Sequence, residues 1–204
     1  GLRAWLAQPD GAQAYALVGM GGMGKSTLAT HFAHALRNEF PDGVLWANVA
    51  SSEPLDILGN WARAYGYDFS TLSDVENRAA ALRSVLADKQ TLIVLDDVRS
   101  VARTRPLLLG GPQCATLITT RDLDVAVALN AHPHVLHELT PQEGHLLLTR
   151  ILGEARVAAE PAAAQEICTL LQNLPLAVEI TPQRLASRPR RRLSDMAERL
   201  RTVE

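Results

Sequence analysis

The chain has 204 residues, of which 47% are hydrophobic, so it can bury one sizeable core or one domain with a small companion. Its formal net charge of −2 offers no general attraction to nucleic acid or to an anionic membrane. No apolar run reaches the roughly 18 residues that a membrane span needs, and the first residues lack a signal-peptide pattern. We therefore expect a cytoplasmic protein with no membrane partner.

The first part of the chain alternates short apolar strands with helices. Strands are expected at 14–18, 43–49, 91–97, 115–120 and 134–139, and helices at 25–36, 54–65, 73–88 and 122–129. The segment TLIVLDD at 91–97 has four consecutive apolar residues before its two acids, as in a parallel strand that is covered on both faces. Ser73 followed by Glu76 indicates a capping box at the start of the third helix. This alternation predicts an α/β three-layer sandwich with a five-stranded parallel sheet.

Beyond Pro141 the pattern changes to helices with no strand between them. The segments HLLLTRIL, QEICTLLQ and PLAVEI all have helical character. Pro182 lies in the last of these helices, which begins at Pro175, and is expected to kink or end it. We therefore expect a nucleotide-binding domain at 1–140 and a small all-α helical subdomain at 141–204.

A glycine-rich loop, GMGGMGKST at 19–27, stands between the first strand and the first helix. Residues 19–26 fit GxxxxGK[ST], the phosphate-binding (Walker A) loop, in the strand–loop–helix context that this loop requires. Its glycines let backbone N–H groups turn toward phosphate oxygens, and the N-terminus of the next helix favours an anion. We expect Lys25 to reach the β- and γ-phosphates, Ser26 to coordinate Mg²⁺, and Thr27 to lie beside the α-phosphate. The candidate nucleotide-binding residues of the loop are Gly21, Gly22, Met23, Gly24, Lys25, Ser26 and Thr27.

Two adjacent acids, Asp96 and Asp97, close the strand predicted at 91–97. Carboxylates at the end of a buried strand are costly unless a cation lies nearby. Asp96 is the candidate to hold Mg²⁺ together with Ser26 (the Walker B role), and Asp97 is the candidate to orient or deprotonate an attacking water. Arg121 follows the next strand, at the sheet edge where ligands of open α/β sheets gather, and is the candidate γ-phosphate sensor. We treat Asp97, Asp96, Lys25 and Arg121 as the candidate catalytic set.

The order of these motifs resembles that of the NB-ARC family, signalling ATPases of the STAND P-loop class that include plant disease-resistance proteins and apoptotic protease-activating factors. The segments similar to that family's motifs are GMGGMGKSTLA, FPDGVLWANV, LIVLDDV, LITTRD, LTPQEGHLLL and NLPLAVEI. The last resembles the GLPLA motif, with Asn173 in place of the glycine. The resemblance implies that Pro175 contacts the adenine face, an assignment that the residues alone do not provide.

The resemblance also implies an ATP/ADP switch that is closed with ADP and that opens and self-associates, in the full-length protein, after exchange for ATP. Hydrolysis would be slow and would depend on Mg²⁺. The chain would be the nucleotide-binding core and first helical (ARC1-like) subdomain of a larger signalling or transcription-regulating protein. The winged-helix part would be absent from it, and sensor and effector domains would flank it.

Two other functions are compatible with a phosphate-binding loop. A small-molecule kinase would need an arginine-rich lid, and residues 122–130 contain no arginine. An ADP-binding structural module that hydrolyses nothing would fit as well, because Asp97 permits hydrolysis without requiring it. The arginine cluster at 188–192 could contact phosphates, but no aromatic residue interleaves it for base stacking, so we expect no nucleic-acid partner through this chain.

Overall fold

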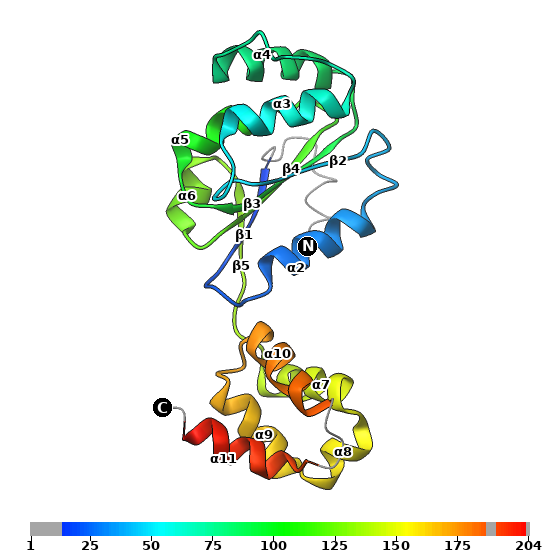
Figure 1. Cartoon of the computed structure of the whole chain (residues 1–204), viewed down its shortest axis with the longest axis vertical. Coiled ribbons are helices and arrows are strands. Elements are labelled where there is room, and N and C mark those ends of the chain that lie inside the picture. The colour runs from blue at the N-terminus through cyan, green and yellow to red at the C-terminus, as the bar shows by residue number, and fades with distance from the viewer. Residues whose placement is uncertain (1–13, 187–190, 203–204) are drawn as a thin grey trace. The chain divides into compact units, whose positions relative to one another are not determined.

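The computed structural model describes residues 14–186 and 191–202 (Figure 1), so part of the arginine cluster at 188–192 lies outside the described residues. The chain divides into two compact units, one of Gly1–Gly19 with Lys25–Leu136 and the other of Met20–Gly24 with His137–Glu204. No helix within the described ranges combines the length and apolar character required to cross a bilayer.

The first unit alternates strands with helices. In chain order its elements are β1 (Ala14–Val18), α2 (Lys25–Ala35), β2 (Val44–Asn48), α3 (Pro54–Ala64), α4 (Val75–Leu86), β3 (Leu92–Val98), α5 (Val101–Thr104), the 3-10 turn η1 (Arg105–Leu107), β4 (Ala115–Thr120), α6 (Leu123–Ala128) and β5 (His132–Val135). The strands pair in parallel in the order β2-β3-β4-β1-β5. Strand β4 therefore lies between β1, which leads into the glycine loop, and β3, which carries the two acids.

Helices cover both faces of this sheet (Figure 1). Alternate residues of β1 point to opposite faces: Tyr15 and Leu17 belong to the core beneath α2, whereas Ala16 and Val18 belong to the core beneath α3 and α4. Burial on both sides explains why β1 and β3 contain continuous apolar runs. The predicted α/β three-layer sandwich with a five-stranded parallel sheet is confirmed for the described residues.

Strand β3 changes its pairing register at the two acids. Ile93 and Leu95 belong to the core beneath α3 and α4, and the next β3 residue in that core is Val98, three positions later instead of two. The ladder with β4 accordingly shifts between Leu95 and Val98, and Asp97 has a φ of 53°, in the left-handed region. An extra residue of this kind bends a strand and re-aims the neighbouring side chains.

Most boundaries in this unit differ from the sequence prediction by one or two residues, and α5 and η1 were not predicted. Two of the differences have a clear physical cause. Strand β5 covers His132–Val135 instead of 134–139, and its four residues are all exposed, so it lacks the alternation of burial on which the prediction relied. Helix α4 begins after Asp74, whose carboxylate accepts the N–H of Asn77 at 2.9 Å. The predicted capping box at Ser73 is therefore wrong, because the adjacent aspartate, which caps at least as well as serine, takes that position.

The second unit is helical, as predicted. Its helices are α7 (Pro141–Leu152), α8 (Glu154–Ala159), α9 (Pro161–Leu170), α10 (Pro175–Ala186) and α11 (Leu193–Arg201). Helix α7 opens with a capping box in which Thr140 and Glu143 each accept the other's backbone N–H. Leu148, Ile167 and Val178 from three of these helices meet in one apolar core.

Helix α10 contains Pro182 in its interior and continues to Ala186. Pro182 was expected to kink or end this helix, and the helix does not end there. Proline removes the hydrogen bond that its N–H would give to the carbonyl of Val178. Val178 and Leu185, which flank Pro182, are buried in the core of the second unit, and this packing outweighs the local preference.

Asn173, which replaces the glycine of the GLPLA motif, has a φ of 51°. Glycine adopts this left-handed conformation without strain, and asparagine tolerates it better than most residues. The backbone of Asn173 donates to the carbonyl of Cys168 and accepts the N–H of Leu139. Its side-chain Oδ1 is buried and has no hydrogen-bond partner among the described residues. Asparagine therefore preserves the turn but leaves one polar atom unsatisfied.

Candidate nucleotide-binding site

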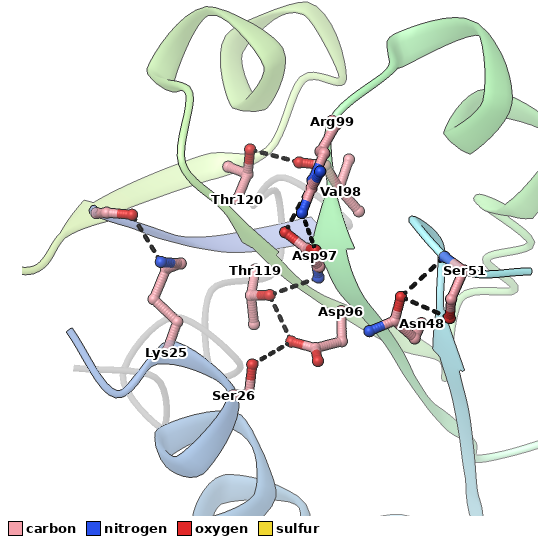
Figure 2. A network of polar contacts seen from close by, with 11 residues as sticks. Lys25, Ser26, Asn48, Ser51, Asp96, Asp97, Val98, Arg99, Thr119 and Thr120 are labelled. Carbon is pink, nitrogen blue, oxygen red and sulfur yellow. Dashed lines mark hydrogen bonds and ion pairs between the residues drawn. The ribbon is translucent and has the colours of Figure 1, made fainter. Parts of the chain in front are cut away.

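The glycine loop after β1 adopts a backbone that side-chain-bearing residues rarely reach. Gly22 and Gly24 have φ values of 84° and 76°. Lys25 is the first residue of α2, and its Nζ donates to the carbonyl oxygen of Gly19 at 2.6 Å (Figure 2). The lysine side chain therefore folds back toward the end of β1, at the start of the loop.

Three elements of the first unit converge on one carboxylate oxygen (Figure 2). Ser26 Oγ, from α2, donates to Asp96 Oδ1 at 2.7 Å, and Thr119 Oγ1, from β4, donates to the same oxygen at 2.6 Å. Thr119 Oγ1 also accepts the N–H of Asp97 at 2.9 Å. Asp96 is only 8% exposed and Thr119 only 1%. The structure thus brings Ser26 and Asp96 together and adds Thr119 to them.

The Ser26 hydroxyl and the Asp96 carboxylate are suitable ligands for Mg²⁺. This ion prefers hard oxygen donors, takes one or two of them from the protein, and fills the remaining positions with water and substrate phosphates. Within the described ranges no group of three or more His, Cys, Asp or Glu side chains is arranged to hold a metal. The Ser26–Asp96 pair supplies two oxygen donors of the kind that Mg²⁺ accepts.

Two cations lie near these acids. Burial lowers the pKa of Lys25, and the positive charge of Arg121 lowers it further, while Asp97 and Asp96 act in the opposite direction. Arg121 follows β4 directly and is exposed. The lysine and the arginine are therefore close enough to repel each other, and a polyanion bound beside both would relieve this repulsion.

Asp97 does not share the environment of Asp96. Its Oδ2 accepts from Arg99 Nη2 at 2.7 Å and its Oδ1 from Arg99 Nε at 3.2 Å. These hydrogen bonds hold the pKa of Asp97 below its usual range, and the charges of Arg99, Arg121 and Lys25 act in the same direction. Sequence reasoning did not identify Arg99. No local pattern indicated it, because the left-handed backbone of Asp97 breaks the alternation of an extended chain, in which side chains two residues apart lie on the same side.

Pro175 begins α10 in the second unit, which also contains residues 20–24. The N–H of Leu176 donates to the carbonyl of Gly22 at 3.0 Å. A Cβ atom at Gly24 would lie 3.9 Å from Cβ of Pro175. Within the second unit, Pro175 thus lies beside residues 22 and 24 of the glycine loop. Of the other candidate residues, Met23 is buried, while Gly21 and Thr27 are exposed.

The sequence comparisons identify relatives that are much longer than this chain. It is 43% identical to "Regulatory protein AfsR" of Streptomyces coelicolor, over 91% of this chain and 19% of that protein. The protein of the same name from Streptomyces griseus is 42% identical, with 91% and 20% covered. "Disease resistance protein SUMM2" of Arabidopsis thaliana is 26% identical, with 87% and 21% covered. The chain spans about a fifth of the length of these relatives.

Solved structures show the same fold at low sequence identity. Cdc6p from Pyrobaculum aerophilum has a TM-score of 0.63 and 17% identity, with 85% of this chain and 55% of that chain covered. RuvB from Thermotoga maritima, as its P216G mutant, has a TM-score of 0.59 and 16% identity, with 93% and 62% covered. These likenesses support a P-loop NTPase fold. The family model described as "NB-ARC domain" matches residues 2–158, which is most of the chain. The chain therefore belongs to the NB-ARC family.

Proposed function

We propose that this domain is an ATP/ADP-binding switch with slow, Mg²⁺-dependent ATP hydrolysis. The observation that carries the proposal is the convergence of Ser26 and Thr119 on the buried Asp96 carboxylate, directly after a glycine loop of Walker A sequence. A buried acid in contact with the first turn of the helix that follows such a loop is what a magnesium–phosphate site requires.

Each candidate residue has a role in nucleotide binding. The backbone N–H groups of residues 21–27 would hold the phosphates, and Lys25 and Arg121 would face the γ-phosphate, whose charge would relieve their mutual repulsion. Ser26 and Asp96 would hold Mg²⁺, which would neutralise negative charge on the β- and γ-phosphates. Pro175 would contact adenine, which is an assignment by family resemblance.

Asp97 is the residue in this set that could act on water. In hydrolysis the water oxygen bonds to Pγ while the bond between Pγ and the bridging oxygen of the β-phosphate breaks. The proton of the water passes to a carboxylate oxygen of Asp97, and the products are phosphate and ADP, which stays bound in the closed state. Thr119 would act through both acids, because its hydroxyl fixes the Asp96 carboxylate and the Asp97 backbone together.

A regulatory role is supported by the names of the longer relatives, which are a regulatory protein and a disease resistance protein. In this proposal the chain is the nucleotide-binding core of a larger cytoplasmic signalling or transcription-regulating protein. Sensor and effector domains in the same polypeptide would flank it, and the ATP state of the full-length protein would self-associate.

A second candidate is an ADP-binding module that does not hydrolyse ATP. The observation that favours it is the pairing of both Asp97 carboxylate oxygens with Arg99, which occupies the candidate base. The two candidates predict the same bound nucleotide and differ in turnover. A measurement of ATP hydrolysis at saturating ATP and Mg²⁺ therefore separates them.

The first experiment is to denature the purified protein and identify the released nucleotide by chromatography. We expect ADP at close to one per chain. Lys25→Ala should weaken ATP affinity by at least about tenfold, because the charge-assisted bonds to phosphate are lost. Lys89→Ala is the matched control. Lys89 pairs with Asp42, and these residues precede β3 and β2, at the opposite ends of those strands from the acids. Equal affinities of the two variants would refute the phosphate-loop assignment.

A further inference from the structure

Arg99 and Asp97 form a pair whose geometry bears on the hydrolytic step. The Arg99 guanidinium contacts both carboxylate oxygens of Asp97, at 2.7 and 3.2 Å. A planar fork bound to both oxygens fixes the orientation of a carboxylate more firmly than a single point charge does. The pair therefore determines where the Asp97 carboxylate points.

The backbone of Asp97 is fixed at the same time. Its φ of 53° places it in the left-handed region, at the register shift between Leu95 and Val98, and its N–H is held by Thr119 Oγ1. The bulge separates the two acids: the Asp96 carboxylate points toward Ser26, whereas the Asp97 carboxylate points toward Arg99 (Figure 2). With its backbone fixed, only a side-chain rotation can bring Asp97 to a water beside the phosphates.

The pair is also easy to break. The Arg99 side chain is 60% exposed, and exposed ion pairs are weak because water and salt screen them. Arg99 stands between the end of β3 and Ser100, the N-cap of α5, so it does not belong to the core of either element. A weak and exposed contact on the candidate base can open and close without disturbing the fold.

We propose that Arg99 is a positioning residue that restrains ATP hydrolysis by holding the Asp97 carboxylate away from the attacking water. This inference rests on the proposed function, because it requires Asp97 to act on that water. Release of the pair frees the carboxylate to rotate toward the phosphates. The domain then turns over slowly while the pair is closed and faster when it is open.

The test measures single-turnover hydrolysis of ATP with saturating Mg²⁺, together with ATP affinity. Arg99→Ala should raise the hydrolysis rate by about three- to fivefold, the range that loss of one exposed ion pair allows, with unchanged affinity. Arg99→Lys, which keeps the charge but loses the fork, should give an intermediate rate. Arg103→Ala is the matched control: it removes the same charge four residues later, from a side chain that pairs with Glu53, and should leave the rate unchanged.

A double variant shows whether Arg99 acts through Asp97. In an Asp97→Ala background, Arg99→Ala should have no effect on the rate. A rise that persists in that background, or a rate that Arg99→Ala leaves unchanged or lowers, would overturn the inference while the nucleotide site stands. If the unaltered protein binds no ATP, the proposed function fails, and the role of Arg99 fails with it.

Discussion

The hydroxyl of Thr119 donates to Asp96 Oδ1 at 2.6 Å and is thereby committed to the acid that faces Ser26. Thr119 Oγ1 also accepts the N–H of Asp97 at 2.9 Å, so one side chain of β4 fixes two consecutive residues of β3. This contact lies where the β3–β4 ladder shifts its register. The strand irregularity and the candidate metal ligand are therefore stabilised by the same group.

Thr119→Val should destabilise the protein by about 1–3 kcal/mol, because it leaves the Asp97 N–H without its acceptor and removes one of the two hydroxyl donors to Asp96 Oδ1. Valine matches the shape of threonine, so packing changes little. The measurement is unfolding by urea, with Thr116→Val as control, since Thr116 is also buried on β4 but lies three residues from these contacts. Equal losses of stability in the two variants would contradict a special role for Thr119.

Asp96→Asn should remove most of the gain in ATP affinity that Mg²⁺ provides. The amide keeps the size of the carboxylate but loses the negative charge that a divalent cation requires. We expect Mg²⁺ to improve binding at least about tenfold in the unaltered protein and little in the variant. Titration calorimetry with and without EDTA measures this. Asp88→Asn, an exposed residue beyond α4 with the same change of charge, should behave like the unaltered protein.

Asn173→Gly should stabilise the second unit by about 1 kcal/mol, because it removes a buried oxygen without a partner and suits a φ of 51°. For a unit of this size the gain corresponds to several degrees in the melting temperature. Asn130→Gly is a close control, with a φ of 54° and an exposed side chain. Asn130→Gly changes only the backbone preference, so we expect a larger gain in stability from Asn173→Gly. Equal gains in the two variants would mean that the buried oxygen of Asn173 costs nothing.

Glu160 connects α9 to the start of α11. Its carboxylate accepts the Ser194 hydroxyl at 2.7 Å and the N–H groups of Leu193 and Ser194 at 3.0 and 3.2 Å. These hydrogen bonds, led by that of the Ser194 hydroxyl, lower the pKa of Glu160 from its ordinary value of 4.5. A depressed pKa stabilises the folded state above the unfolded value, and this contribution is lost as the pH falls through the folded value.

Glu160→Gln should therefore lower the melting temperature at pH 7, and the difference from the unaltered protein should shrink as the pH falls below 4.5. Thermal unfolding followed by circular dichroism across this range provides the comparison. Glu179→Gln, on an exposed position of α10, should leave the melting temperature unchanged throughout. A difference at Glu160 that is constant with pH would mean that the carboxylate charge contributes nothing.

Much of the fold was predictable because its signals are local. The strands beside the site are covered on both faces and read as apolar runs, and the glycine loop carries its own backbone requirements in its sequence. The edge strand β5 was misplaced because exposed residues leave no pattern of burial. The end expected at Pro182 did not occur because tertiary packing of Val178 and Leu185 outweighs a local preference.

The candidate site was predictable in composition and less so in geometry. Residue types and spacing pointed to Lys25, Ser26 and the two acids. The bulge in β3 depends on pairing with β4, which begins more than fifteen residues later, so the residues adjacent to Asp97 do not predict it. Its consequences, the bridge from Thr119 and the rotation of Asp97 toward Arg99, could be found only after β3 and β4 were placed side by side.

The insertion of β4 between β1 and β3 sets the distance between the strand that leads to the glycine loop and the strand that carries the two acids. Adjacent strands lie about 4.8 Å apart, so the strand that leads to the phosphate loop and the strand that carries the acids are separated by roughly 10 Å. With β1 beside β3 the gap would be half as wide. The interposed strand thus keeps the end of β1 and the end of β3 on opposite sides of β4, whose own end is followed by Arg121.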